Sequence, residues 1–573
     1  MKNVLRPIIV GVMTLVAVST PRAQGVVNPF PNEQKAMHPR FDLVNLRPDT
    51  LETRVGGMGW FSDGRLVLAI RTEGKQGPVP GYVLVLDNVL SGDKNKITSK
   101  KYFSGLDEPL GLSVVNDVVY VIDRKSIKKL VDANKDGVAE SSVDIGPNHL
   151  PSGASAGTHP YAFDLVYHDG YFYHEFGVWN GKPPYRGHMM KTSLDGSTQV
   201  SVANGLRHSN GTGFGPEGEL FTTDNQGDYL PANKFINVRK GRFYGHQGSD
   251  PYPGIPNPAV ESPAAVYIPE GEAGNSPSQP FYLTTGMFAG QMLMGDVRYG
   301  NIHRVFLEKV NGEFQGALFH FAGGLESGIN RISLGPDGAI YLGGIGQVDG
   351  NCCWAGLNGK EFGLERIKEN NTAVFDMLAV RSYNGKFEIE FTQPVGAGAE
   401  LAAAYQVKMW RYKPTSDYGG PRIDQKNLVV KTVQVSQDKK KVVLEIDALE
   451  EKSIVYIKLL NVKSSTGQTA WSTETWYTLN AINPDNVVRV VPPNYSKEAR
   501  MAFSVAGPGG VTAKVAVEGD YELTVKDVTG AVRETLRGHG PGNRALGSIL
   551  PRGVYTAGLK SESALYSKIL LIP

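Results

Sequence analysis

Five stretches of the sequence share one form: an apolar strand, a short turn centred on Gly or Asp, and a second apolar strand. They read GWFSDGRLVLA (59–69), GLSVVNDVVYVID (111–123), FDLVYHDGYFYHE (163–175), GTGFGPEGELFTTD (211–224) and INRISLGPDGAIYLGG (329–344). The turn residues Gly64, Asp117, Gly170 and Gly218 follow at intervals of 53, 53 and 48 residues, and Gly338 comes 120 residues later. The stretch MFAGQMLMGDV (287–297), with Gly290 at its turn, fills this long gap.

A repeat of about fifty residues that holds four strands is typical of the blades of a β-propeller. Six such units predict an all-β chain built on a six-bladed β-propeller over residues 40–365. Because the loops of a propeller converge at one end of a central channel, we expect a concave binding site there.

The blade period ends near Gly363, and alternating runs such as KFEIEF (386–391) then predict a β-sandwich over residues 372–482. The pattern returns in a second immunoglobulin-like β-sandwich over residues 487–573. Its closing phrase GVYTAGLKSESALYSKILLIP (553–573) resembles the C-terminal immunoglobulin-like or sorting modules of secreted bacterial proteins. A small sandwich without a sorting role is an equally good interpretation.

The N-terminus has the layout of a secretory signal peptide over residues 1–25. Lys2 and Arg6 precede an apolar run at 7–18, and small residues follow around Ala23. We therefore expect export to the periplasm or the cell surface of a Gram-negative bacterium. No later stretch is long and apolar enough to predict a membrane span. The 59 basic and 57 acidic residues are mixed along the chain, which argues against a nucleic-acid partner.

Cys352 and Cys353 are adjacent in NCCW and are the only two cysteines of the chain. Two interpretations remain open, a pair of free thiols and a strained vicinal disulfide. Export favours the disulfide, because an oxidising compartment promotes disulfide formation. We expect the pair near the mouth of the channel.

The most informative segment outside the repeats is GLRHSNGTGFGPEGELFTTDNQGDYLPANKFINVRKGRFYGH (205–246). It resembles the soluble quinoprotein glucose dehydrogenase and sorbosone dehydrogenase family, six-bladed propellers that use pyrroloquinoline quinone (PQQ) and Ca²⁺. The matching parts are the phrase around Arg207 and Asn210, the acidic loop 224–228, and the Gly-x-x-Tyr-Gly phrase at 241–245.

This resemblance implies a cofactor site with three residues of this chain. Arg207 would lie against the quinone and stabilise negative charge on its oxygens, as both a catalytic and a cofactor-binding residue. Asn210 lies in the same phrase as a further cofactor-binding residue. Arg331 is the candidate for gripping the carboxylates of the quinone.

The resemblance also implies a metal ion and a base. Asn225, Gln226 and Gly227 would offer carbonyl oxygens to Ca²⁺, a hard cation that prefers oxygen ligands. His159, just before the third repeat, would take the proton of the substrate hydroxyl as the catalytic base.

The motif DANKDGVAE (132–140) predicts a second calcium site. Asp132, Asn134 and Asp136 alternate as in the first half of an EF-hand loop, and Gly137 permits the sharp turn. Val143 occupies the twelfth position, where such loops have Glu, so a plain polar turn is the alternative.

The leading hypothesis is an exported dehydrogenase that oxidises a sugar or small polyol with a quinone cofactor. The electron acceptor is not identified by the sequence. One alternative is a propeller lyase or hydrolase that acts on a polysaccharide without a quinone. The other is a non-catalytic propeller that binds carbohydrate or protein.

Overall fold

The structure is a computed structural model. It describes residues 36–72, 80–150, 162–178, 184–253, 255–346 and 361–484, together with most of 501–572. This part of the chain is all-β, as predicted, and its helices are four single 3-10 turns. These turns are η2 (Val89–Ser91), η3 (Lys94–Lys96), η4 (Pro216–Gly218) and η5 (Ala402–Ala404). Among the described residues, no helix has the length and apolar composition that crossing a membrane requires.

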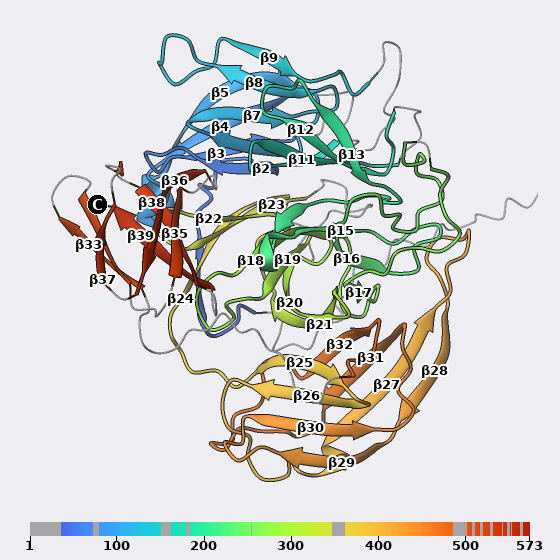
Figure 1. Cartoon of the computed structure of the whole chain (residues 1–573). Coiled ribbons are helices and arrows are strands. Elements are labelled where there is room, and N and C mark those ends of the chain that lie inside the picture. Colours follow the sequence, from blue (N-terminus) through green and yellow to red (C-terminus); the bar gives the residue numbers. More distant parts are fainter. Residues whose placement is uncertain are drawn as a thin grey trace, which may run out of the picture.

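Six antiparallel sheets, here called blades 1 to 6, follow one another around a central axis (Figure 1). Blade 1 contains β2 (Val55–Trp60), β3 (Leu66–Ile70), β4 (Gly81–Asp87) and β5 (Thr98–Leu106). Blade 2 contains β6 (Gly111–Val115), β7 (Val118–Ile122), β8 (Ile127–Val131) and β9 (Ser141–Ile145). Blade 3 contains β10 (Ala162–His168), β11 (Tyr171–Phe176), β12 (His188–Ser193) and β13 (Gln199–Ala203). Blade 4 contains β14 (Thr212–Phe214), β15 (Leu220–Asp224), β16 (Asn233–Asn237) and β17 (Val266–Ile268).

Blade 5 contains β18 (Pro277–Tyr282), β19 (Met292–Asp296), β20 (Asn301–Val310) and β21 (Glu313–Ala322). Blade 6 contains β22 (Gly328–Leu334), β23 (Ile340–Ile345), β24 (Phe362–Glu369) and the N-terminal strand β1 (Phe41–Asn45). The six innermost strands contact one another in sequence, and β22 contacts β2, so the ring is closed. The pairing of β1 with β24 in blade 6 joins the two ends of the propeller. Residues 41–369 thus form a six-bladed β-propeller, as predicted.

The marker residues of the repeats lie between the first and second strands of the six blades. All six have positive φ, with values of 91° at Gly64, 61° at Asp117, 86° at Gly170, 72° at Gly218, 86° at Gly290 and 73° at Gly338. Gly and Asp adopt this left-handed conformation more readily than most residues, which explains the pattern. The fifth connection differs from the prediction, because residues 283–291 form a longer loop between β18 and β19.

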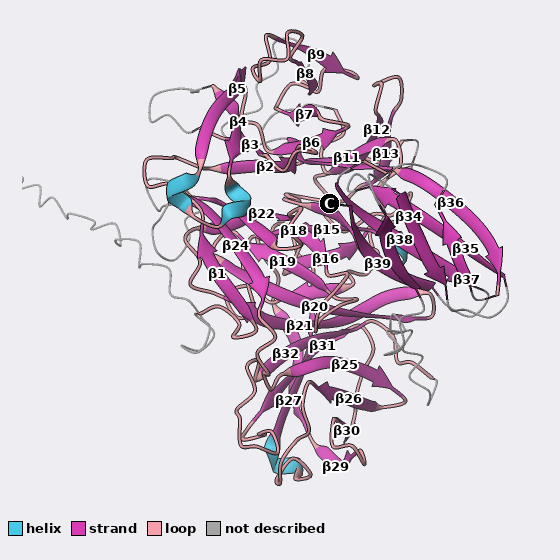
Figure 2. Ribbon diagram, turned by 90° about the vertical axis from the view of Figure 1, so that its left-hand side faces the viewer, coloured by secondary structure: helices cyan, strands magenta, loops and turns pink. Residues whose placement is uncertain are grey.

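The strands after the propeller form two sheets that face one another below blade 5 (Figures 1 and 2). The first sheet contains β25 (Met377–Tyr383), β26 (Lys386–Phe391), β30 (Lys441–Ile446) and β29 (Val430–Val435). The second contains β32 (Glu474–Leu479), β31 (Ser453–Leu459), β27 (Tyr405–Tyr412) and β28 (Arg422–Leu428). Buried side chains such as Phe387, Ile389, Val407 and Tyr477 fill the space between them.

The second sheet is continuous with blade 5, a feature that the sequence did not predict. The outermost strand of the blade, β21, pairs with β32 from Gly316 opposite Thr478 to Phe319 opposite Thr475. One eight-stranded sheet therefore passes from the propeller into the sandwich. The predicted division of the chain into one propeller and two sandwich domains stays a prediction.

A buried arginine strengthens this junction. Arg304 of β20 is fully buried and lies between the rings of Phe288 and Phe319, at 4.3 and 4.2 Å. Its guanidinium donates to the carbonyl oxygen of Leu378 and pairs with Asp376 at 3.3 Å. Burial lowers the pKa of Arg304 to about 10, so it stays protonated and tethers the sandwich to blade 5.

The last strands form two further sheets around their own core. One contains β33 (Met501–Ala506), β34 (Gly510–Val515) and β37 (Gly542–Ala545). The other contains β36 (Val532–His539), β35 (Asp520–Asp527), β38 (Gly553–Ser561) and β39 (Leu565–Ile572). Leu523, Val525, Ala557 and Leu559 are buried in this core.

A buried histidine, His149, follows β9 and packs against blade 3, and we expect it to make the stability of the protein sensitive to acid. His149 stacks on His174 and packs edge-on against Phe176, and burial lowers its pKa to about 3. The unfolded chain binds a proton near pH 6.5 and the folded chain does not, so stability decreases as the pH falls from 6.5 towards 3. The free energy of unfolding should therefore be lower at pH 5 than at pH 7, and we expect His149→Phe to reduce this difference by about 2 kcal/mol. The pH dependence that remains in the variant includes the contribution of the buried His174, whose pKa is also lowered by burial. Urea unfolding of both proteins at the two pH values tests this, and equal pH dependence would contradict it.

Candidate functional site

The mouth of the channel is the end of the propeller at which the chain reaches each innermost strand. Arg207 precedes β14 and Asp224 ends β15, and antiparallel pairing brings these positions together. The Asp224 carboxylate accepts hydrogen bonds from the backbone amides of Arg207 and His208, both at 2.8 Å. Burial raises the pKa of Asp224 to about 6, although these amides favour its charged form. Asp224 therefore fixes the turn that carries Arg207.

The Arg207 side chain lies in a narrow space between a propeller loop and a loop of the sandwich. Its Nη1 donates to the carbonyl oxygen of Gln226 at 3.0 Å, and its Nε lies 3.9 Å from Oδ1 of Asp228. The Tyr418 ring, which belongs to the loop between β27 and β28, lies with its centre 5.0 Å from the guanidinium carbon. A Cβ at Gly227 would lie only 2.2 Å from Cδ of Arg207, so this contact requires glycine.

Asp228 also pairs with His246, whose Nε2 lies 3.1 Å from Oδ2 of the carboxylate. The side chain of His246 is 3% exposed and that of Asp228 is 46% exposed. Burial lowers the pKa of His246, so its ring is neutral at pH 7 and donates from Nε2 to Asp228. One carboxylate is thus oriented by a histidine and an arginine while it remains accessible to a ligand. Such a group accepts hydrogen bonds from hydroxyls and can take a proton.

Three of these residues had no predicted role. Asp228 and His246 both lie within the segment 205–246, next to the phrases that carry the resemblance. This proximity is the sequence feature from which they could have been chosen as candidates. Tyr418 lies about 190 residues further along the chain, and no local pattern connects it with Arg207.

Two of the three predicted calcium oxygens of the 225–227 loop accept hydrogen bonds from the protein. The Gln226 carbonyl accepts from the Arg207 guanidinium, and the Gly227 carbonyl accepts from the amide of Gly419 at 2.9 Å. The side-chain Oδ1 of Asn225 is buried without a hydrogen-bond partner. Because a permanent cation occupies one predicted ligand, this loop does not fit a Ca²⁺ ion in the described conformation.

Arg331 and Asn210, the other predicted cofactor residues, lie inside the channel. Arg331 is 1% exposed, and its guanidinium donates to the carbonyl oxygens of Asn210, Asn330 and Leu110. Its Nε lies 3.6 Å from Oδ1 of Asp164. The side chain of Asn210 donates to Oδ1 of Asn330 at 2.9 Å. These groups belong to blades 2, 3, 4 and 6, so the network joins four blades across the channel.

The network bears on the cofactor hypothesis. Arg331 directs both Nη groups at backbone carbonyls and its Nε at a buried carboxylate, so it does not present them to the carboxylates of a quinone. Arg207 is committed to Gln226 and Asp228 and is covered by Tyr418. The described residues therefore do not form the expected quinone site.

The Gly-x-x-Tyr-Gly phrase is structural. The Tyr244 hydroxyl is buried and donates to the carbonyl oxygen of Asn237 at 2.7 Å. Gly245 has a φ of 115°, and its backbone passes close to the Glu261 carboxylate. The Tyr244 carbonyl accepts from Nζ of Lys234, which also pairs with Glu261. The phrase closes the outer part of blade 4.

The Asp132 loop lies between β8 and β9 on the outside of blade 2. Oδ1 of Asp132 accepts from the Asp136 amide at 3.2 Å, and Asn134 accepts from the same amide at 2.8 Å. Carboxylate oxygens of Asp132, Asp136 and Glu140 lie within 4.8 Å of one another. Glu140 had no predicted role. Its carboxylate lies where it can take the place of the glutamate that is missing from the twelfth position of the loop.

We expect Ca²⁺ to raise the melting temperature through this loop. An ion that binds the folded state alone stabilises it by about 2.7 kcal/mol at a hundred times its Kd. Thermal scans with Ca²⁺ and with a chelator test this, and Asp136→Ala is expected to abolish the difference. Identical melting curves for the wild-type protein in both solutions would contradict the prediction.

His159 lies outside the described residues, and so do Cys352 and Cys353. The base, its position opposite Arg207 and the redox state of the cysteine pair therefore stay predictions.

No family model matches this chain, and the comparison with curated proteins found no match. Several solved structures are similar in part. A putative oxidoreductase (glucose dehydrogenase) from Thermus thermophilus is 16% identical, with a TM-score of 0.42, over 57% of this chain and 100% of its own. The PQQ-bound aldose sugar dehydrogenase from Streptomyces coelicolor is 16% identical, with a TM-score of 0.37, over 58% and 100%. The PQQ domain of pyranose dehydrogenase from Coprinopsis cinerea is 10% identical, with a TM-score of 0.40, over 59% and 98%. These similarities are too distant to assign an activity, so we base the function on the chain's own residues.

Proposed function

We propose that this protein binds a carbohydrate, a sugar or small polyol, at the mouth of its propeller and presents one hydroxyl to Asp228. The observation that carries the proposal is the accessible Asp228 carboxylate, which His246 holds at 3.1 Å and Arg207 approaches at 3.9 Å. An accessible carboxylate suits the hydroxyls of a sugar because it accepts hydrogen bonds from them, and its contacts with His246 and Arg207 hold it in place.

Oxidation of the bound hydroxyl is the reaction that this arrangement supports best. Asp228, beside the Arg207 cation, is placed to take the hydroxyl proton, and the hydrogen on the adjacent carbon leaves as hydride to a two-electron acceptor that is supplied from solution. His246 is a positioning residue in this scheme, since its ring contacts Asp228 from the buried side. The resemblance of residues 205–246 to the sugar dehydrogenase family supports the same reaction class.

PQQ with Ca²⁺, the cofactor pair that the resemblance implies, is not part of this proposal. The predicted calcium oxygens of Gln226 and Gly227 accept hydrogen bonds from the protein, and Arg331 is sealed in the channel. The proposed reaction therefore does not use PQQ.

We further propose that the protein is exported. The basic residues at 2 and 6, the apolar run at 7–18 and the small residues that follow support a signal peptide. Mass spectrometry of the N-terminus in the periplasmic and surface fractions tests this, and an uncleaved chain in the cytoplasm would contradict it.

The function is tested with the full mature chain on a panel of sugars and polyols. Binding is measured by calorimetry, and oxidation by reduction of an artificial acceptor, in one arm without additions and in one with PQQ and Ca²⁺. We expect saccharide binding that Asp228→Ala weakens. Absence of binding across the panel would overturn the proposed function, and acceptor reduction that depends on PQQ would overturn our exclusion of the quinone.

A further inference from the structure

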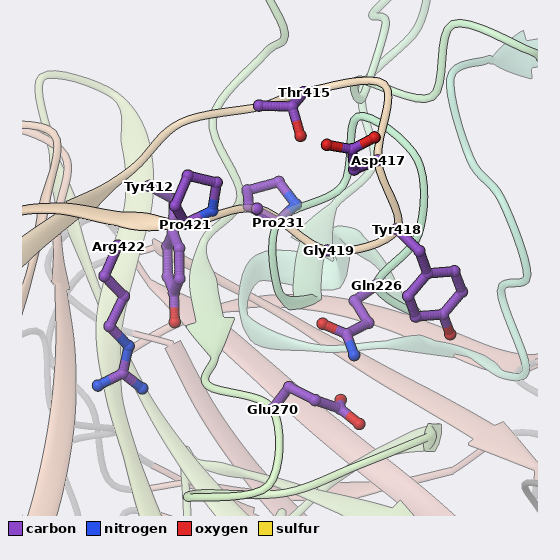
Figure 3. Close-up of a pocket in the computed structure, with 11 residues that line it drawn as sticks. Gln226, Pro231, Glu270, Tyr412, Thr415, Asp417, Tyr418, Gly419, Pro421 and Arg422 are labelled. Atoms are coloured by element: carbon purple, nitrogen blue, oxygen red, sulfur yellow. The ribbon is translucent and has the colours of Figure 1, made fainter.

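A cavity of about 500 Å³ opens between blade 4 and the sandwich (Figure 3), and two of its lining residues, Gln226 and Tyr418, also contact Arg207. This volume is within the range of about 300–1,000 Å³ that is usual for small-molecule sites. The propeller contributes Gln226, Pro231 and Glu270 to its lining. The sandwich contributes the residues at and between the ends of β27 and β28, namely Tyr412, Thr415, Asp417, Tyr418, Gly419, Gly420, Pro421 and Arg422.

The sandwich wall of this cavity is held in place by backbone contacts. The Tyr229 amide donates to the carbonyl oxygen of Thr415 at 2.7 Å, and the Gly419 amide donates to that of Gly227 at 2.9 Å. A Cβ at Gly420 would lie 2.5 Å from the carbonyl oxygen of Lys413 and 2.6 Å from Cβ of Pro231. The loop thus fits closely against the propeller, and a ligand meets a preformed wall.

The lining combines one flat aromatic surface with hydrogen-bonding groups of both kinds. Tyr418 is 65% exposed, which is unusual for so large an aromatic side chain. Figure 3 places the carboxylates of Asp417 and Glu270 on opposite sides of Gln226, with the Tyr418 ring beside them. Burial raises the pKa of Glu270 to about 7, so this carboxyl is partly protonated at neutral pH and both donates and accepts hydrogen bonds.

The positive charge of the cavity is compensated by the protein. Arg422 pairs with Glu272 at 2.6 Å and lies over the Trp410 ring at 4.2 Å. Because the Arg422 guanidinium already has these partners, the groups that face a ligand are hydrogen-bond acceptors such as Asp417 and the partly protonated carboxyl of Glu270. This set suits a neutral molecule rich in hydroxyls better than an anion.

The cavity and the Asp228 site share a wall. Gln226 lines the cavity and accepts the hydrogen bond from Arg207, while Tyr418 lines the cavity and covers the Arg207 guanidinium. Asp228 and Tyr418 are paired as an isolated β-bridge. A sugar unit in the cavity would therefore adjoin a unit whose hydroxyl reaches Asp228.

We propose that this cavity is a second saccharide subsite, in which Tyr418 stacks on the sugar next to the one at Asp228, so that the protein prefers oligosaccharides to monosaccharides. The inference rests on the proposed function, and the carbohydrate-binding role of the sandwich loop goes beyond it. An aromatic ring suits the apolar face of a pyranose, and such stacking accounts for about threefold to tenfold in affinity.

The test is calorimetric titration of the full chain with glucose, galactose, mannose and xylose, and with their α-1,4- and β-1,4-linked oligomers of two to six units. For the sugar that binds, we expect the disaccharide to have about threefold to tenfold higher affinity than the monosaccharide. Tyr418→Ala is expected to remove this gain, and Tyr418→Phe to retain it. Because Tyr418 also covers Arg207, the readout is the ratio of oligomer affinity to monosaccharide affinity within each variant. Leu401→Ala, at another exposed apolar position of the sandwich (56%), is the control and should match the wild-type protein.

The outcomes separate the two proposals. Equal affinity for monomer and oligomers, or a gain that survives in Tyr418→Ala, would overturn the subsite and leave the proposed function intact. No binding of any monomer or oligomer would overturn both. Oligomer binding that requires Tyr418 but is unchanged in Asp228→Ala would support the cavity as a saccharide site and contradict the role of Asp228.

Discussion

Replacement of Asp228 by Asn is expected to lower the turnover of the bound sugar or polyol by about 10²–10⁴-fold. The amide keeps the shape of the side chain and its contact with His246, but it cannot take the hydroxyl proton. Substrate affinity is expected to change far less, since the amide oxygen still accepts a hydrogen bond. The effect should therefore fall on kcat, with KM close to the wild-type value.

The measurement is steady-state oxidation of the preferred sugar with an artificial acceptor. Asp169→Asn is a matched control, because Asp169 also lies beside a histidine, 3.3 Å from His168, at 64% exposure in the turn between β10 and β11. This control should keep wild-type turnover. An Asp228→Asn enzyme with unchanged kcat would show that another group accepts the proton.

Replacement of Arg331 by Leu is expected to lower the free energy of unfolding by about 3–5 kcal/mol. Three backbone carbonyls would lose their donor, and the buried Asp164 carboxylate would lose its nearest cation, 3.6 Å away. Since these partners come from separate blades, the loss should loosen the centre of the ring. Arg331→Lys keeps the charge but not the forked geometry, so an intermediate loss is expected.

Urea unfolding of the purified variants measures this effect. Arg65→Leu is the control, because Arg65 is 36% exposed and forms an ion pair with the neighbouring Asp63 at the surface. Its expected change is below about 1 kcal/mol. The double variant Arg331→Leu, Asp164→Asn should lose less than the sum of the single losses, because the stranded carboxylate is then removed. A near-neutral Arg331→Leu would contradict the structural role and reopen a ligand role for this residue.

Much of the fold could be predicted because its signals are local. Gly170 and Gly338 are needed within their own turns, where φ is positive, and the six turns repeat at the spacing of the blades. The Asp132 loop was recognisable for the same reason, since its oxygens come together within nine residues.

The site depended on contacts between distant parts of the chain. Arg207 was identified from its phrase, but only the packing of the sandwich loop against the propeller places Tyr418 over it, and only the folded blade gives its hydrogen bond to Gln226. Arg331 was predicted as a cofactor residue because the family resemblance requires a group that grips the carboxylates of the quinone, and Arg331 in the sixth repeat was the candidate. Closure of the ring buries it instead.

By itself, the sequence determined the all-β class, the six repeated hairpins and the segment 205–246 as the region of interest, because turn conformation and strand alternation are set by residues a few positions apart. The tertiary structure alone decided that β21 pairs with β32, that Arg331 fills the channel and that a sandwich loop completes the wall beside Arg207. Those features arise because polar backbone groups and charged side chains lose water when strands from distant parts of the sequence pack together. The partners of these groups are therefore determined only when the ring and the shared sheet form.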